Sequence, residues 1–179
     1  CDLQDGKKYL ESYDYLILSP GAGPVVPDLP GINLPNVFTV RNVPDSDRLK
    51  EYIETAKPAS AVVVGGGFIG LEMVEALRLK GASVTVVEAD RQIMGALDPE
   101  MAVIIQKYLQ GQGVGLVLGD KLTALQGVSR VERLILESGR EIPAAMVVLA
   151  IGVKPEVRLA VEAGLAIGVT GGIQVDEYM

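Results

Sequence analysis

The expected fold is decided by Ala61-Val62-Val63-Val64-Gly65-Gly66-Gly67-Phe68-Ile69-Gly70, in which four apolar residues run directly into a G-x-G-x-x-G turn. The turn opens a stretch with helical periodicity, 68–80, and a β-like run, 82–87, follows and ends at Glu88. A strand, a glycine turn, a helix, a second strand and a terminal acid form the dinucleotide-binding βαβ unit. The pattern therefore predicts an α/β fold with a nucleotide site at this turn.

Each glycine of the turn has its own expected task. Gly65 permits the tight turn, Gly67 lets backbone N–H groups approach a pyrophosphate, and Gly70 lets the helix pack closely on the strand. The positive end of the helix dipole, which begins at Phe68, then faces the phosphates. A glycine-rich loop alone is weak evidence, but here the required strand and helix stand on both sides of it.

Glu88 follows Gly70 at the spacing of the acid in this motif. A carboxylate there can accept hydrogen bonds from both hydroxyls of an adenosine ribose. The alternative is a solvated acid at a strand end, which the preceding glycine turn makes the weaker interpretation.

Composition excludes several other classes of protein. The 179 residues carry a net charge of −7 without a basic stripe, which disfavours nucleic acid as a partner. The chain has no histidine and one cysteine, Cys1, so Cys/His zinc sites and Ser-His-Asp or Cys-His catalysis are excluded, and neither a metal site nor a catalytic residue is expected within it. No apolar run is long enough for a membrane span, and the N-terminal residues show no basic-then-apolar signal pattern, which predicts a cytoplasmic protein.

The rest of the chain divides into short predicted elements. We expect strands within residues 1–18, including Tyr15 to Leu18, then a Pro-rich connector over 19–35. A helix after Pro44 and a second helix after Asp98, burying Met101, Ile104, Ile105 and Tyr108, should follow. The β-like runs 114–118, 121–125 and 131–137 predict an antiparallel meander, 145–150 a buried strand, 156–163 a short helix, and 171–176 a turn and strand.

Four segments occur in a recognisable order along the chain. Tyr13 to Ala22 precedes the Pro-rich linker that ends in Leu29-Pro30-Gly31, the glycine turn continues as Leu71-Glu72-Met73, Ala150 to Pro155 follows a strand, and Ile173 to Glu177 comes last. Together they closely resemble the FAD-dependent pyridine nucleotide-disulfide oxidoreductases over essentially the whole chain. Ser19-Pro20-Gly21 resembles the branch of coenzyme A-disulfide reductases, NADH oxidases and NADH peroxidases.

The resemblance implies a Rossmann-like NAD(H)-binding domain over residues 41–150, whose crossover is the antiparallel meander. Residues 1–40 would be strands of an FAD domain and a linker, and residues 151–179 a return segment toward that domain. The chain would then be an internal part of a longer enzyme, with the FAD glycine turn, the redox cysteine and a dimerisation domain elsewhere. The partners implied are NADH, the remainder of the FAD domain and a second copy of the parent, which would be a homodimer.

The resemblance also assigns cofactor-binding positions. Gly65, Gly67 and Gly70 would hold the pyrophosphate, and Phe68 is a further cofactor-binding position. Glu88 would bind the ribose and disfavour the 2′-phosphate of NADPH. Ile69 and Glu72 would lie near the nicotinamide, with Ile151 and Gly152 on its other side. Helix packing for Ile69, a dipole contact for Glu72 and a simple strand end for Gly152 are the alternatives.

Two functions are consistent with this sequence. The first is the NAD(H)-binding part of a flavoprotein that passes hydride from NADH to FAD, for reduction of a cysteine-based centre, disulfide, peroxide or oxygen, with the 179-residue chain inactive alone. The second is a stand-alone NAD(H)-binding or sensing module without catalysis of its own.

Overall fold

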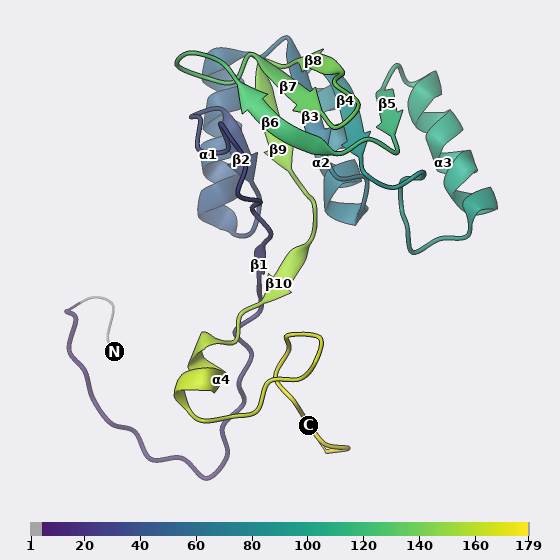
Figure 1. Ribbon diagram of the computed structural model, residues 1–179. Coiled ribbons are helices and arrows are strands. Elements are labelled where there is room, and N and C mark those ends of the chain that lie inside the picture. Colours follow the sequence, from purple (N-terminus) through teal and green to yellow (C-terminus); the bar gives the residue numbers. More distant parts are fainter. Residues whose placement is uncertain (1–4, 179) are drawn as a thin grey trace. The chain divides into compact units, whose positions relative to one another are not determined.

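Five parallel strands form the central sheet of residues 23–154, one of the two units into which the chain divides. The computed structural model describes residues 5–178. In spatial order the strands are β2 (Val37–Thr39), β9 (Met146–Leu149), β3 (Ser60–Val64), β4 (Ser83–Glu88) and β5 (Gly115–Leu118), and every neighbouring pair is parallel (Figure 1).

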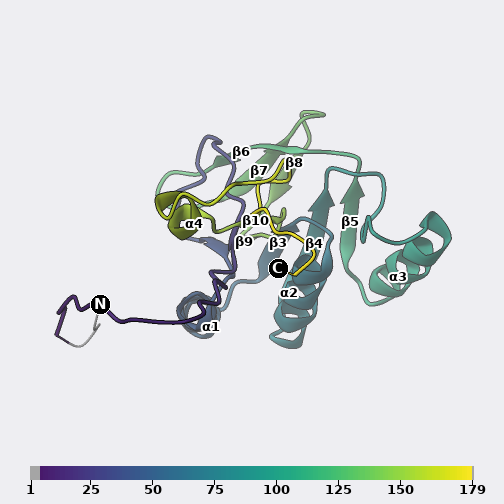
Figure 2. The ribbon, with the colours of Figure 1, turned by 90° about the horizontal axis from the view of Figure 1, so that it is seen from below.

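Two layers cover the two faces of this sheet. Helices α1 (Val43–Ala56) and α2 (Phe68–Leu79) lie on one face, and the antiparallel meander of β6 (Leu122–Gln126), β7 (Arg133–Leu136) and β8 (Glu141–Pro143) lies on the other (Figures 1 and 2). Helix α3 (Pro99–Gly111) joins β4 to β5 at the edge of the sheet. The predicted parallel sheet with an antiparallel meander is confirmed.

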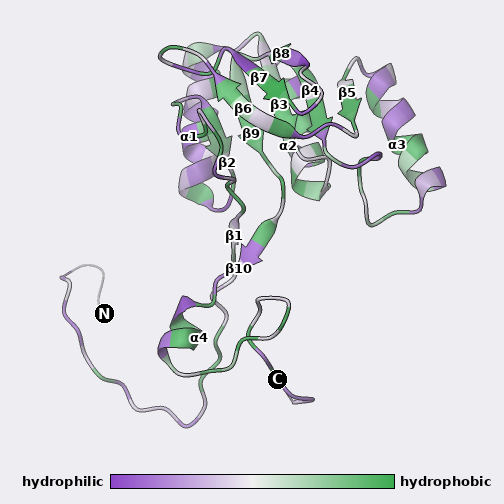
Figure 3. Ribbon diagram, in the orientation of Figure 1, coloured by the Kyte–Doolittle hydropathy of each residue, from purple (hydrophilic) through white to green (hydrophobic). Residues whose placement is uncertain are grey.

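The apolar run before the glycine turn is continuous because both faces of β3 are buried. Successive strand residues point to opposite faces, so Ala61 and Val63 join the core beneath the helices, whereas Val62 and Val64 join the core beneath the meander. Figure 3 shows the strands of the central sheet as largely hydrophobic. The two cores therefore fix β3 on both sides and hold its carboxyl end in place.

The βαβ unit has the predicted boundaries. Helix α2 begins at Phe68 with Gly67 as its N-cap, and it ends just before Gly81, whose φ of +86° favours glycine. Gly70, Val74 and Leu77 are the buried residues of α2 and face the sheet. The helix after Pro44 is also confirmed, with Leu49 buried and Tyr52 packed against the same core.

Asn36 ties three segments of this unit together. It is fully buried, and its Nδ2 donates to the carbonyl oxygens of Val131 (2.9 Å) and Ala145 (2.7 Å). Its Oδ1 accepts from the backbone N–H of Val131 at 2.6 Å. These bonds satisfy the side chain and join the start of β2 to the loops before β7 and β9.

The prediction of which face of α3 is buried is wrong for three of its four residues. Met101, Ile104 and Tyr108 are more than half exposed, with exposed fractions of 54%, 61% and 66%. Of the predicted set only Ile105 packs against the core, together with Leu109, and Ala102 is buried. Both sets recur at helical spacing on one helix, and the position of β5 decides which set is covered.

The antiparallel meander begins one strand later than predicted. The run over residues 114–118 becomes β5, which pairs in parallel with β4 after the crossover through α3. A strand that follows a helical crossover joins the same sheet in parallel, which explains the difference. The buried strand predicted over 145–150 is confirmed as β9, all of whose residues are buried.

Residues 1–22 and 155–179 form the second unit, of which 5–22 and 155–178 are described. It contains helix α4 (Arg158–Glu162), at the predicted place. The predicted strand Tyr15 to Leu18 is wrong, because these residues find no hydrogen-bonded partner strand in the described part of the chain and Ile17 is 89% exposed. The predicted strand near the end is reduced to a single bridge, Ile167 to Ile173, beside a turn.

Two further short strands pair with each other. They are β1 (Ala22–Pro24), which the Pro-rich connector was not expected to contain, and β10 (Val153–Pro155). Cys1 and the first residues of the strands predicted within 1–18 lie outside the described residues.

Candidate functional site

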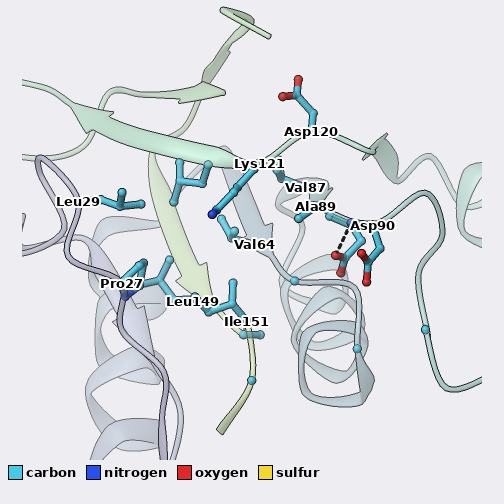
Figure 4. A pocket seen from close by; sticks show the side chains of 17 residues that line it. Pro27, Leu29, Val64, Val87, Ala89, Asp90, Asp120, Lys121, Leu149 and Ile151 are labelled. Carbon is cyan, nitrogen blue, oxygen red and sulfur yellow. Dashed lines mark hydrogen bonds between the residues drawn. The ribbon is translucent and has the colours of Figure 1, made fainter. Parts of the chain in front are cut away.

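A cavity of about 540 Å³ lies where the carboxyl ends of β3, β4 and β9 meet. Its walls include the last residues of these strands, Val64, Glu88 and Leu149, and the turns that follow them (Figure 4). Carboxyl edges of parallel strands are the usual ligand sites of open α/β sheets. The full lining is Pro27, Leu29, Val64, Gly65, Gly67, Val87, Glu88, Ala89, Asp90, Gly95, Asp120, Lys121, Leu122, Leu149, Ala150, Ile151 and Gly152.

The glycine turn at the floor of the cavity excludes side chains at two of its positions. Gly65 has a φ of +106°, and a β-carbon on it would collide with the carbonyl group of Ala150. A β-carbon on Gly70 would collide with the carbonyl oxygen of Gly65. The turn and the first helical turn of α2 therefore pack backbone against backbone, as the motif predicts.

Gly67 faces open space instead. No heavy atom lies within 4 Å of the position that its β-carbon would occupy, and its φ of −82° is accessible to any residue. No side chain caps α2 at this residue. The first N–H groups of the helix are thus left for another acceptor, and the positive end of the helix dipole points the same way.

Glu88 is hydrogen-bonded to backbone on two sides. Its Oε2 accepts from the N–H of Gly66 at 2.6 Å, and its Oε1 accepts from the N–H of Asp90 at 2.9 Å. The carboxylate therefore joins the glycine turn to the end of β4. A carboxylate has about four lone-pair positions, so two remain for a ligand.

The segment after β4 closes over the glycine turn. The N–H of Met94 donates to the carbonyl oxygen of Gly66 at 2.8 Å, and Ile93 is completely buried. A β-carbon on Gly66 would lie 2.6 Å from the Cγ2 atom of Ile93. Met94 adopts a left-handed conformation with a φ of +52°, which is unusual for a residue other than glycine. The side chain of Ile93 and the backbone of Met94 together therefore hold the glycine turn in place.

Five of the residues predicted from sequence line this one cavity: Gly65, Gly67, Glu88, Ile151 and Gly152. Gly70 lies buried beneath the turn, where it packs as expected. Phe68, Ile69 and Glu72 are exposed and do not belong to the lining. Their contacts with a cofactor stay predictions.

Sequence reasoning missed the opposite wall of the cavity. Pro27 and Leu29 come from the Pro-rich connector, and Asp120, Lys121 and Leu122 follow β5. The signal for the second group was available, because β5 ends at the same edge of the sheet as β3 and β4. Assigning 114–118 to the meander hid that relationship.

The charges of the lining come from Glu88, Asp90, Asp120 and Lys121. Asp120 accepts hydrogen bonds from the Oγ of Ser138 (2.6 Å) and from its backbone N–H (3.1 Å). The bond from the Ser138 hydroxyl lowers the pKa of Asp120 below its ordinary value. Asp120 is therefore a fixed negative charge at neutral pH.

Residues 5–178 contain no cluster of three or more acidic, histidine or cysteine side chains that could hold a metal ion. Over the same range, none of the helices has the length and apolar character that crossing a membrane requires.

Comparison with known families identifies the class of protein to which this site belongs. Residues 1–179 match the pyridine nucleotide-disulphide oxidoreductases along the whole chain. The chain belongs to this family. The family predicted from the linked sequence motifs is therefore confirmed, and a pyridine-nucleotide oxidoreductase of this kind agrees with the Rossmann-like fold.

Curated relatives of the chain are named as NADH- or NAD(P)H-dependent oxidoreductases. The chain is 39% identical over 180 residues to an NADH oxidase of Methanocaldococcus jannaschii, covering 100% of this chain and 40% of that protein. It is 40% identical over 177 residues to an NAD(P)H sulfur oxidoreductase (CoA-dependent) of Pyrococcus abyssi, covering 98% of this chain and 39% of that protein. The chain thus spans about two fifths of the length of these oxidoreductases.

Solved structures of the family have the same fold. The reduced CoADR-RHD of Bacillus anthracis shares 49% identity with a TM-score of 0.92, over 97% of this chain and 31% of that one. The water-forming NADH oxidase of Lactobacillus brevis, solved bound to NADH, shares 28% identity with a TM-score of 0.85, over 99% of this chain and 39% of that one.

Proposed function

We propose that the cavity at the carboxyl ends of β3, β4 and β9 binds NADH, and that the chain is the NAD(H)-binding part of a flavoprotein oxidoreductase. The observation that carries the proposal is the uncapped start of α2 at Gly67, which opens onto this cavity without a side chain in the way. Backbone N–H groups at a helix N-terminus favour a phosphate group.

The residues of the cavity fit the parts of a dinucleotide. The turn from Gly65 to Gly67 leaves room for a pyrophosphate against the backbone. Glu88, already oriented by the N–H groups of Gly66 and Asp90, has lone pairs left for the hydroxyls of the adenosine ribose. A carboxylate at that place repels a 2′-phosphate, which favours NADH over NADPH.

Ile151 and Gly152 form the wall at the end of β9, where we place the nicotinamide half. Gly152 has a φ of +122°, and its carbonyl oxygen accepts from the N–H of Val25 at 2.9 Å. This bond anchors the wall to the connector. When bound, the nicotinamide supplies a hydride for a flavin, and the contribution of the protein is orientation and exclusion of water.

We assign the rest of the activity to a longer protein. In that proposal residues 41–150 are the NAD(H)-binding domain, and residues 1–40 and 151–179 belong to an FAD domain. The family description supports a disulfide as the electron acceptor, and the names of the relatives support a CoA-dependent sulfur compound or, for an oxidase, oxygen. A peroxide is the remaining alternative. A cytoplasmic location and a homodimeric parent are parts of the same proposal.

The proposal is tested by titrating NADH into the purified chain and following the fluorescence of the nicotinamide. We expect saturable binding to one site, with ADP-ribose displacing NADH because it carries the pyrophosphate and both riboses. Circular dichroism confirms that the chain is folded during the titration. A folded chain that shows no saturable NADH binding would contradict the proposal.

A further inference from the structure

One positive side chain extends into the cavity opposite the glycine turn. Lys121 is the single cation among the residues that line it, beside Glu88, Asp90 and Asp120. Figure 4 shows its ammonium group directed into the cavity, away from Asp120, toward Val64 at the end of β3. No ion pair or side-chain hydrogen bond is formed by Lys121 with any residue of the described range 5–178.

The backbone that carries Lys121 is fixed on both sides. The N–H of Asp120 donates to the carbonyl oxygen of Glu88 (3.2 Å), and the N–H of Glu137 donates to the carbonyl oxygen of Lys121 (2.8 Å). The carboxylate of Asp120 is held in turn by Ser138. Lys121 therefore starts from a rigid base shared by β4 and the meander, and only its side chain is free to adjust.

The surroundings of the ammonium group favour an anionic ligand. The nearby walls are apolar and include Leu29, Val64 and Leu149 (Figure 4). Between walls of low dielectric a charge interacts more strongly than in open water. The protein has a net charge of −7, so a local cation favours the binding of a ligand that carries two phosphate charges.

We propose that Lys121 is a ligand-binding residue that pairs with the pyrophosphate of the dinucleotide from the side opposite the glycine turn. This inference rests on the proposed NADH site. The N–H groups at the start of α2 and the Lys121 ammonium then contact the same anionic group from two sides.

The test compares Lys121→Met with Lys107→Met, the same substitution on an exposed residue of α3 that does not line the cavity. Dissociation constants for NADH, NADPH and ADP-ribose are measured by titration at two salt concentrations. We expect Lys121→Met to lower the affinity for all three ligands about tenfold, the effect of losing one charge-assisted hydrogen bond. The substitution should also reduce the salt dependence of binding. Lys121→Arg should restore most of the affinity, and Lys107→Met should change nothing.

The outcomes separate this inference from the proposed site. If the unmodified chain binds NADH and Lys121→Met binds it equally well, the role of Lys121 is wrong and the site stands. If the loss is confined to NADPH, Lys121 lies beside the 2′-phosphate and the pyrophosphate assignment is wrong. If the folded, unmodified chain binds neither NADH nor ADP-ribose, the proposed function itself fails.

Discussion

The Oε2 atom of Glu88 accepts a hydrogen bond from the backbone N–H of Gly66 at 2.6 Å, across a separation of 22 residues. The acid at the end of β4 thus orients the glycine turn that follows β3. Because Glu88 also accepts from Asp90, removing its side chain leaves two backbone donors without their partner. We therefore expect Glu88 to act both on the turn and on nucleotide choice.

Replacing Glu88 tests this double role. In the unmodified chain NADH should bind more tightly than NADPH. Glu88→Ala should weaken the binding of NADH about tenfold or more, since hydrogen bonds to charged groups contribute about 1.5–3 kcal/mol each. It should also reduce the difference in affinity between NADH and NADPH, because the charge that repels the 2′-phosphate is gone. Glu75→Ala, at an exposed position of α2, is the control. Equal affinities of the unmodified chain for both nucleotides would remove Glu88 from this role.

Helix packing at the turn makes a prediction about stability. Gly70→Ala should lower the free energy of unfolding by about 1–3 kcal/mol, the usual cost of overpacking, because the new methyl group meets the carbonyl oxygen of Gly65. Gly67→Ala is the matched control, since its methyl group meets nothing within 4 Å. Urea denaturation followed by circular dichroism measures both. Equal stability of the two variants would show that the close approach is not needed.

Sequence predicted the βαβ unit well because three independent signals agree there. The apolar run, the glycine spacing and the helical period each have a strict physical cause, and the resulting β3, α2 and β4 match within about a residue. The exposed side of α3 was not predictable in the same way. Its sequence carries two apolar faces, and only the packed sheet shows that Ala102, not Met101, is covered.

Tertiary placement also explains what was missed in the site. Lys121 belongs to no sequence motif, and its place in the cavity depends on β5 lying beside β4 in a parallel sheet. Residues Tyr15 to Leu18 show the converse case, in which the sequence predicts an element that the structure does not contain. An apolar run predicts a strand, but a strand forms only where a neighbour supplies the hydrogen bonds.

The buried amide of Asn36 provides a second stability prediction. Asn36→Ala removes three hydrogen bonds and leaves the N–H and carbonyl groups of Val131 without these partners, whereas the carbonyl oxygen of Ala145 keeps the hydroxyl of Tyr52 at 3.2 Å. We expect a loss of about 2–4 kcal/mol in the free energy of unfolding, since each unpaired buried group costs about 1–3 kcal/mol. Asn33→Ala, at an exposed position nearby, should change it by less than about 0.5 kcal/mol. Similar losses for both variants would contradict the account.

Asp120 makes a prediction about pH. The hydrogen bond from Ser138 lowers the pKa of Asp120 below its ordinary value of 3.8. A lowered pKa in the folded state means that this carboxylate favours folding above its unfolded-state pKa, and that the contribution is lost as the pH falls through the folded-state pKa. Ser138→Ala should raise the pKa of Asp120 toward 3.8, measured by NMR titration of the carboxyl carbon. An unchanged pKa in that variant would show that Ser138 is not the cause.

The central claim is tested most directly by NADH titration of Gly67→Val. Gly67 stands at the uncapped start of α2, and valine fits its backbone angles, so the variant should fold while its side chain fills the space where the pyrophosphate meets the turn. Gly111→Val at the end of α3, where a side chain also meets nothing within 4 Å, is the matched control. We predict that NADH binding is abolished in Gly67→Val and unchanged in Gly111→Val. A folded Gly67→Val variant that binds NADH with the affinity of the unmodified chain would contradict the assignment of this turn.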